Sequence, residues 1–159
     1  MTTGRLQELL PPDTHLAFAA MRELRPDWSD ESVFVQQVDE VQRSAGYRIV
    51  GVFGTPRHAL AVAGFHAGSN LAWGRHIYLA DLSTVAGERG HGHAGRLLDW
   101  LSDEAGRLGC GQIHLDSGVG ADRTAAHRLY FNAGYRISSH HFTRTRSGGG
   151  DPGEGTPSD

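Results

Sequence analysis

The stretch Glu88–Leu98, ERGHGHAGRLL, raises the question that decides the fold. Within it, Gly90, Gly92 and Gly95 match G-x-G-x-x-G, the pattern of a loop that cradles a dinucleotide pyrophosphate in a Rossmann fold. Glycine supplies 22 of the 159 residues, so roughly 0.4 chance matches are expected in a chain of this composition. The motif alone therefore does not identify the loop. The helices and strands on either side of it have to be considered.

Composition indicates a single globular domain over residues 1–146, without the charge excess of a nucleic-acid-binding protein. Hydrophobic residues make up 38% and the formal net charge is -3. All 15 basic residues are Arg, so no lysine can act as a base, and the single cysteine, Cys110, excludes an internal disulfide. No apolar run is long enough to span a membrane. We expect a cytoplasmic protein that binds neither nucleic acid nor a membrane, with a disordered polar tail at 147–159.

Hydrophobic periodicity predicts two helices and then three strands before the glycine-rich stretch. Helical spacing covers 14–24 and, after Asp30, 31–46. The strand-like runs are 47–54, 59–67 and 75–84. Short turns join these strands and leave no room for a helical crossover, so they form an antiparallel meander. The run at 4–10 allows one further short strand at the start.

The chain after the glycine-rich stretch alternates helices with strands. The patterns predict a helix over 92–107, a strand over 111–118, a helix over 122–134 and one or two final strands over 135–145. Because a helix separates 111–118 from the strand before it, these two strands are parallel neighbours. A Rossmann fold needs its loop after the first strand and several β-α units behind it. Only 64 residues follow Gly95, which excludes that fold.

Read from Arg89 instead of Gly90, the same stretch resembles the acyl-CoA signature of the GNAT superfamily of acyl-CoA N-acyltransferases. That signature is [Q/R]-x-x-G-x-[G/A], which Arg89–Ala94 matches. A second family motif, A-x-x-x-Y-x-x-x-G-[F/Y], matches Ala126–Tyr135, and the HHF of 140–142 is similar to a closing strand of small-molecule members such as aminoalkylphosphonate N-acetyltransferases. The resemblance covers about residues 5–146. It implies the GNAT fold, an α/β fold with a mixed sheet whose central strands splay apart.

The chemistry of the loop suits acetyl-CoA as the co-substrate that this resemblance implies. Glycines let backbone N–H groups approach a pyrophosphate, and the following helix adds its positive dipole end. The two histidines are two residues apart, without a carboxylate pair or a thiol nearby, so we expect no metal. The chain departs from the family at Ala86, often Pro, and at Arg123, often Asn. The expected cofactor-binding residues are Leu82, Ser83, Thr84, Arg89, Gly90, His91, Gly92, His93, Ala94, Gly95, Arg123 and Ala126.

The resemblance implies direct transfer of the acetyl group to an amine. Tyr130 is the expected acid for the departing thiolate, since a tyrosine with a pKa of about 10 stays protonated at neutral pH. Backbone N–H groups of 82–84 are the expected oxyanion donors. Asp81 is the first choice as base, on a strand whose alternation puts 79, 81 and 83 on one face and 80, 82 and 84 on the other. The alternatives for the base are Asp116, Ser117 and Glu31.

The acceptor pocket is expected at the connection 25–32, the loop 69–74 and the region 138–141. Aromatic walls and carboxylates there suit a cationic amine. The expected lining residues are Trp28, Glu31, Trp73, Tyr78 and Asp116. The resulting hypothesis is an N-acetyltransferase for a small primary amine, with a homodimer as a weaker expectation. A protein N-terminal or lysine acetyltransferase, an O-acyltransferase and a non-catalytic acyl-CoA-binding domain stay open, although Tyr130 favours catalysis.

Overall fold

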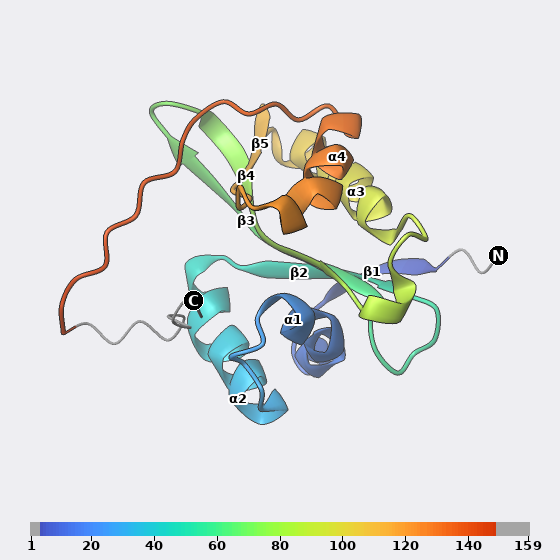
Figure 1. Ribbon diagram of the computed structural model, residues 1–159. Coiled ribbons are helices and arrows are strands. Elements are labelled where there is room, and N and C mark those ends of the chain that lie inside the picture. Colours follow the sequence, from blue (N-terminus) through green and yellow to red (C-terminus); the bar gives the residue numbers. More distant parts are fainter. Residues whose placement is uncertain (1–3, 149–159) are drawn as a thin grey trace.

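The computed structural model describes residues 4–148 and contains one five-stranded sheet with helices on both faces (Figure 1). The strands lie in the order β1-β2-β3-β4-β5. They are β1 (Arg5–Leu9), β2 (Arg48–Phe53), β3 (Ala61–Asn70), β4 (Gly74–Thr84) and β5 (Gln112–Leu115). Neighbours from β1 to β4 are antiparallel, whereas β4 and β5 are parallel. The predicted meander joined to a parallel unit is therefore confirmed, including the short first strand.

The predicted helices lie where the periodicity put them, but the first two are divided. The helices are α1 (Phe18–Leu24), α2 (Glu31–Gln36), α3 (His93–Leu108) and α4 (Thr124–Asn132). A 3-10 turn, Asp13–Ala17, precedes α1, and a π-helical turn, Gln37–Gln42, and a 3-10 turn, Arg43–Ala45, continue α2. The carboxylate of Asp30 accepts a hydrogen bond from the Val33 N–H at 3.1 Å, which caps the start of α2.

Two hydrophobic cores sandwich the sheet. On one face, Phe18 and Met21 of α1 and Phe34 of α2 pack against Ile49 of β2. On the other face, the leucines of α3 pack against Phe65 and Ile77 in the middle of the sheet. The described residues include no helix with the length and apolar character that a membrane crossing requires.

A β-bulge at Ala80 changes which side chains of β4 face which core. Gly64 pairs with Asp81, but the next residue, Phe65, pairs with Leu79, so Ala80 is the extra residue. The expected strict alternation from 79 to 84 is wrong for this reason, because one inserted residue reverses the faces beyond it.

The side chains on either side of the bulge record this reversal. Leu79 and Leu82 both pack in the α3-side core, although they are three positions apart. Asp81 and Ser83 face α1, where the Ser83 hydroxyl donates to the Ala20 carbonyl oxygen at 2.6 Å. The bulge therefore directs Asp81 away from α3 and towards α1.

Strands β4 and β5 separate after four residue pairs. The parallel ladder joins His76–Leu79 to Gln112–Leu115 and ends there, while β4 continues to Thr84 bonded to β3. The edge of β4 from Ala80 to Thr84 is consequently unpaired on its β5 side. The splayed central strands that the family resemblance implies are confirmed.

The predicted final strands over 135–145 are wrong: the structure has no strand there. Helix α4 ends at Asn132, and the positive φ of 89° at Gly134 then turns the chain, so that the following residues run away from the sheet (Figure 1). In the described chain this segment pairs with no strand, although the outer edge of β5 is unpaired. The predicted disordered tail lies almost wholly outside the described residues, which end at 148.

Gly64 lets the Tyr47 hydroxyl pass over β3, because a Cβ at Gly64 would overlap that hydroxyl. Tyr47 is buried and cannot move aside. We predict that Gly64→Ala lowers the free energy of unfolding by about 1–3 kcal/mol, the usual range for overpacking. Urea denaturation measures the change, and Gly87→Ala, where no atom lies within 4 Å of the added Cβ, is the control. Equal stability of the two variants would contradict this packing.

Candidate active site

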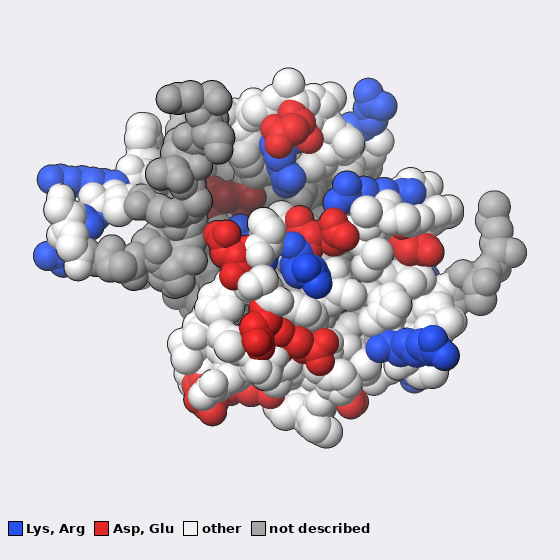
Figure 2. Space-filling model, turned by 60° about the horizontal axis from the view of Figure 1, so that its bottom comes forward, with Lys and Arg blue, Asp and Glu red and all other residues white. Residues whose placement is uncertain are grey.

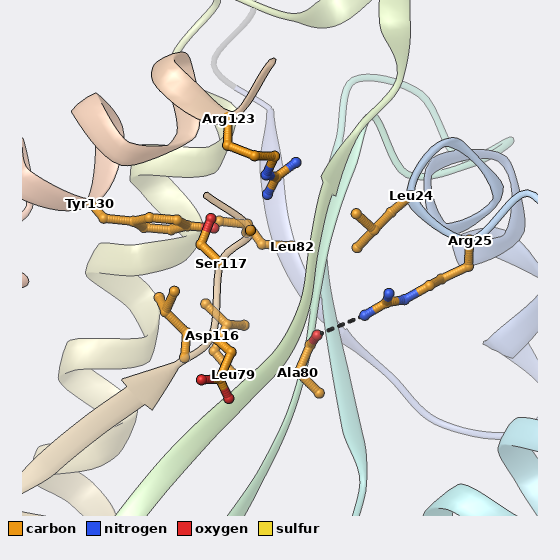
Figure 3. Close-up of a pocket in the computed structure, with 11 residues that line it drawn as sticks. Leu24, Arg25, Leu79, Ala80, Leu82, Asp116, Ser117, Arg123 and Tyr130 are labelled. Carbon is orange, nitrogen blue, oxygen red and sulfur yellow. Dashed lines mark hydrogen bonds between the residues drawn. The ribbon is translucent and has the colours of Figure 1, made fainter. Parts of the chain in front are cut away.

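The separation of β4 and β5 opens a cleft of about 190 Å³ (Figure 3). Its walls come from the end of α1, both diverging strands, the loop after β5 and α4. The lining residues are Leu24, Arg25, Leu79, Ala80, Leu82, Leu115, Asp116, Ser117, Gly118, Arg123 and Tyr130. The cleft thus collects residues from four distant parts of the chain.

Tyr130 projects from α4 into this cleft, towards Leu82 and Ser117 (Figure 3). Its ring packs edge-on against Tyr135, with the centroids 6.0 Å apart. Burial raises the pKa of Tyr130, and the positive charge of Arg123 offsets part of that rise. The phenol therefore remains protonated at neutral pH and can donate a hydrogen bond or a proton.

Ser117 follows β5 and lines the cleft beside Tyr130 (Figure 3). Its hydroxyl oxygen is buried and has no hydrogen-bond partner among the described residues. Buried polar atoms normally have a partner, so this hydroxyl is available to a bound molecule. No base contacts the hydroxyl, which is therefore not activated as a nucleophile.

Asp81 lies beside the cleft but is bound on both carboxylate oxygens. Arg25 Nε donates to Oδ1 at 2.8 Å, and the Tyr47 hydroxyl donates to Oδ2 at 2.7 Å. Arg25 also donates through Nη2 to the Ala80 carbonyl oxygen at 3.2 Å (Figure 3). Burial and the Asp81 charge raise the pKa of Tyr47 well above its usual value, so Tyr47 stays a donor. The Asp81 side chain is 15% exposed and holds the bulge against α1.

Asp116 lies at the end of β5 and is open to the cleft. The Tyr78 hydroxyl donates to it, and burial together with this contact raises the pKa of Tyr78 to about 12. His141 Nδ1 lies 3.5 Å from the other carboxylate oxygen. The Asp116 side chain is 47% exposed, which leaves it room to contact a substrate.

The glycine-rich loop at the start of α3 has the geometry of an anion site. Gly90 and Gly92 both have φ of 80°, which lets the loop turn tightly before the helix. Gly92 is the N-cap, and no side chain caps the first N–H groups of α3. Arg89 is 63% exposed and 3.6 Å from Glu23, so its guanidinium is accessible to an anion. Ala94 and Gly95 lie in the first turn of α3.

The fold adds Glu88 to the two histidines of this loop. Ligand atoms of Glu88, His91 and His93 lie within 4.8 Å of one another, a cluster with the composition of a metal site. Two features disfavour a metal there. Among residues 4–148 the buried Nδ1 of His93 has no hydrogen-bond partner, whereas a metal-binding imidazole usually donates from its second nitrogen to an acceptor. The N-terminus of α3 also repels a cation. That no metal binds stays a prediction.

The expected acceptor residues do not form one pocket. Tyr78 and Asp116 meet at the cleft, but Trp73 stacks on His114 near the β3–β4 turn, with centroids 3.6 Å apart. Trp28 lines a separate hollow with Asp27 and Asp30, and Glu31 begins α2 beside it. Acidic side chains gather on this face of the molecule (Figure 2).

Six of the eleven lining residues were not predicted as site residues from the sequence: Leu24, Arg25, Leu79, Ala80, Leu115 and Gly118. Leu24 and Arg25 end α1, and no local pattern marks them as facing a strand more than 50 positions later. Gly118 closes the loop after β5, where the His127 ring contacts its carbonyl oxygen at 2.8 Å. Arg123, predicted at the position where Asn is usual, does line the cleft, whereas Ala126 lies one turn before Tyr130 on α4.

Comparison with known proteins places the chain in one family. The model of the Acetyltransferase (GNAT) family matches residues 11–135. The uncharacterized N-acetyltransferase YhdJ of Bacillus subtilis (strain 168) is 30% identical over 129 residues, which cover 80% of this chain and 88% of YhdJ. The chain therefore belongs to the GNAT acetyltransferase family and is an acyltransferase, and enzymes of this family take the acyl group from acyl-CoA.

Solved structures agree with this fold. A transcriptional regulator from Bacillus halodurans C-125 superposes with a TM-score of 0.75 at 15% identity, over 90% of this chain and 99% of that one. An aminoglycoside acetyltransferase, HMB0005, from an uncultured soil metagenomic sample gives a TM-score of 0.72 at 16% identity, over 90% of this chain and 98% of that one. At this identity the likeness concerns the fold alone.

Gly92 needs its left-handed conformation to present the α3 N-terminus to an anion. A residue with a Cβ pays about 1–2 kcal/mol there, which corresponds to about tenfold in affinity. We predict that Gly92→Ala weakens binding of coenzyme A about tenfold by isothermal titration. Gly106→Ala, on α3 but away from the loop, where no atom lies within 4 Å of the new Cβ, is the matched control. Unchanged affinity in Gly92→Ala would contradict the role of the loop.

Proposed function

We propose that the protein transfers the acetyl group of acetyl-CoA to a primary amine of a small molecule, by direct attack of the amine. The observation that carries this proposal is the meeting of three features in one cleft: the unpaired edge of β4, the exposed Asp116 and the protonated Tyr130. The anion-binding loop follows β4 directly, at the next helix in the chain.

The free edge of β4 suits the pantetheine arm of acetyl-CoA. Backbone N–H and C=O groups between Ala80 and Thr84 have no partner on the β5 side, so an extended amide-containing arm can bind them like an added strand. The pyrophosphate then reaches the loop 89–95. Backbone N–H groups of 82–84 would donate to the oxyanion as it forms, and the unpartnered Ser117 hydroxyl is a further donor to the arm.

Direct attack fits the side chains of the cleft better than a covalent intermediate. Cys110 does not line the cleft, and Ser117, which does, has no base in contact with its hydroxyl. The amine itself is then the nucleophile. Tyr130 would give its proton to the departing thiolate, because its raised pKa keeps it protonated until the thiolate forms.

Asp116 is a better candidate for the base than Asp81. A general base needs a free oxygen within reach of the substrate. Both oxygens of Asp81 accept hydrogen bonds from Arg25 and Tyr47, and Asp81 does not line the cleft. Asp116 lines it and is about half exposed; Tyr78 donates to one of its oxygens, while the other lies 3.5 Å from His141 and is open to a substrate. We therefore propose Asp116 as the base and Asp81 as a positioning residue.

A small cationic acceptor suits the dimensions and charge of the site. The cleft, at about 190 Å³, would hold the end of the pantetheine arm together with the acceptor amine, and the little room left for the acceptor suits a small molecule. Residues 22–40, which approach the cleft at Arg25, contain six carboxylates and two arginines. Because Arg25 and Arg123 line the cleft itself, the attraction of an ammonium group would come from Asp116 and from the acidic side chains that gather on the face with α1 and α2 (Figure 2).

A mass-spectrometric screen of small primary amines with acetyl-CoA, read also as thiol release, identifies the acceptor. With that acceptor, we predict that Tyr130→Phe lowers kcat by about 10²–10³ and leaves the affinity for acetyl-CoA nearly unchanged, because the acid acts on the departing thiolate. Tyr135→Phe, in the same ring pair, is the control. A change in kcat of less than about threefold would remove Tyr130 from this role. Failure to bind coenzyme A would overturn the proposed function.

The two carboxylates are distinguished by the pH dependence of kcat/KM. Without its base, an enzyme must wait for the amine to lose its proton unaided, so the rate rises only at higher pH. We predict that Asp116→Asn moves the rising limb of the profile to higher pH and that Asp81→Asn leaves the limb in place while lowering the melting temperature. The reverse assignment, with the limb moved by Asp81→Asn alone, would restore Asp81 as the base.

A further inference from the structure

Arg123 lines the cleft together with Tyr130 and Ser117, and its positive charge has no counterion there. It is the N-cap residue of α4, and Figure 3 shows its guanidinium directed into the cleft. Among residues 4–148 this guanidinium makes no hydrogen bond or ion pair. A cation without a counterion in a half-buried cleft is available to a negatively charged group of a bound molecule.

The loop after β5 supports the Arg123 side chain. The aliphatic stem of Arg123 lies against Gly118, because a Cβ added to Gly118 would be 3.5 Å from Arg123 Cγ. The carbonyl oxygen of Gly118 lies 2.8 Å from Nε2 of His127, one turn further along α4. These contacts keep the stem against the loop and leave the guanidinium beyond it, in the cleft.

The proposed reaction creates a negative charge beside these residues. When the thioester C–S bond breaks, its electron pair stays on sulfur, and Tyr130 is the proposed proton donor. An ordinary thiol has a pKa of about 8.5 and an ordinary tyrosine a pKa of about 10. Burial raises the pKa of Tyr130 and widens this gap, and the charge of Arg123 offsets only part of the rise. A proton from Tyr130 alone is therefore a weak stabiliser of the departing sulfur.

We propose that Arg123 and Ser117 bind the departing sulfur of coenzyme A as a thiolate. The guanidinium supplies a positive charge that does not titrate near neutral pH. The Ser117 hydroxyl supplies a hydrogen bond to sulfur, and its buried oxygen has no other partner among the described residues. This role of the two side chains rests on the proposed function and extends it.

The charges balance over the transfer step. The amine nitrogen bonds to the acyl carbon, the C–S bond breaks, and its electron pair stays on sulfur. The proton that the amine loses goes to Asp116, the proposed base. Tyr130 donates a hydrogen bond and then its proton to sulfur, and Arg123 stabilises the negative charge on whichever of the two atoms carries it.

The other charged residues of the cleft do not replace Arg123. Arg25 donates through Nε to Asp81 at 2.8 Å and through Nη2 to the Ala80 carbonyl oxygen at 3.2 Å, so its charge is already paired. Asp116 is negative and would oppose a thiolate, although water screens its half-exposed carboxylate. An asparagine, which the family often has at position 123, carries no charge. The proposed thiolate site is therefore a feature of this chain.

The ionisation of the bound thiol tests the proposal without any turnover. Cys110→Ser removes the single thiol of the protein, so the thiolate absorbance with coenzyme A, minus that with desulfo-coenzyme A, reports the coenzyme alone. We predict that binding lowers the pKa of this thiol by at least about one unit, equivalent to about tenfold tighter binding of the thiolate than of the thiol. Arg123→Gln should abolish most of this lowering and Arg123→Lys should retain it. Arg128→Gln, an exposed arginine on α4 outside the cleft, is the matched control.

Turnover provides an independent measurement once an acceptor is found. Arg123→Gln is expected to lower kcat about tenfold, since one pKa unit corresponds to tenfold in rate, and Arg123→Lys should restore most of it. Ser117→Ala should lower kcat by a similar factor of about ten, because it removes a hydrogen bond to a charged atom. Affinity for desulfo-coenzyme A, which lacks the sulfur, should change less than about threefold in each variant, a difference of under about one pKa unit.

Three results would overturn the thiolate site. One is a bound thiol with the pKa that it has in solution, and another is an equal effect of Arg123→Gln and Arg128→Gln. The third is an equal loss of affinity for coenzyme A and desulfo-coenzyme A in Arg123→Gln, because Arg123 would then bind the pantetheine arm and not the sulfur. A protein that binds no coenzyme A would fail the proposed function as well, so the two failures are distinguishable.

Discussion

The site depends on one interruption in hydrogen bonding, the end of the ladder between β4 and β5 after Leu79. The bulge at Ala80 bends β4 at this point, and Arg25 holds the bend by donating to the Ala80 carbonyl oxygen and to the Asp81 carboxylate. The Tyr47 hydroxyl, just before β2, also donates to the Asp81 carboxylate, which it reaches through the space that Gly64 leaves open. Residues far apart in sequence thus stabilise the separation of β4 from β5, whereas neighbouring strands of a sheet normally pair their backbone groups along their length.

The unpaired edge explains why the proposed catalytic groups converge where they do. Parallel strands that separate leave room for an extended ligand between them, and the residues just beyond each strand face that ligand from both sides. Asp116 and Ser117 follow β5, while the loop with Arg89 follows β4. Helix α4 then passes over the opening with Tyr130 directed inward (Figure 3). The polar chemistry of the cleft is therefore a consequence of the topology, which also leaves the buried Ser117 hydroxyl there without a hydrogen-bond partner among the described residues.

The sequence predicts those features that local pattern determines. Glycine spacing and the adjoining helix mark the loop 89–95 as a candidate anion site, and apolar periodicity locates the meander and α3, because each of these signals lies in consecutive residues. The bulge at Ala80 has no such signal, because it arises from packing Asp81 against α1 and Tyr47. Arg25, which binds Asp81, lies 56 positions away in the sequence. Because no local pattern shows that this arginine occupies the carboxylate, Asp81 looked free to act as a base. The prediction of final strands was wrong for a related reason. Residues 135–145 have the composition of a strand, but a strand forms only where a partner strand lies in register.

The central claim, that the free edge of β4 receives the acyl donor, can be measured directly by hydrogen–deuterium exchange with and without coenzyme A. In the free protein, some amides of Ala80–Thr84 lack a partner on the β5 side and should exchange fast, as should those of the loop 90–95. The account predicts that coenzyme A slows exchange at both places and leaves the amides of β1 and β2 unchanged. Protection of the loop without any protection of β4 would contradict it.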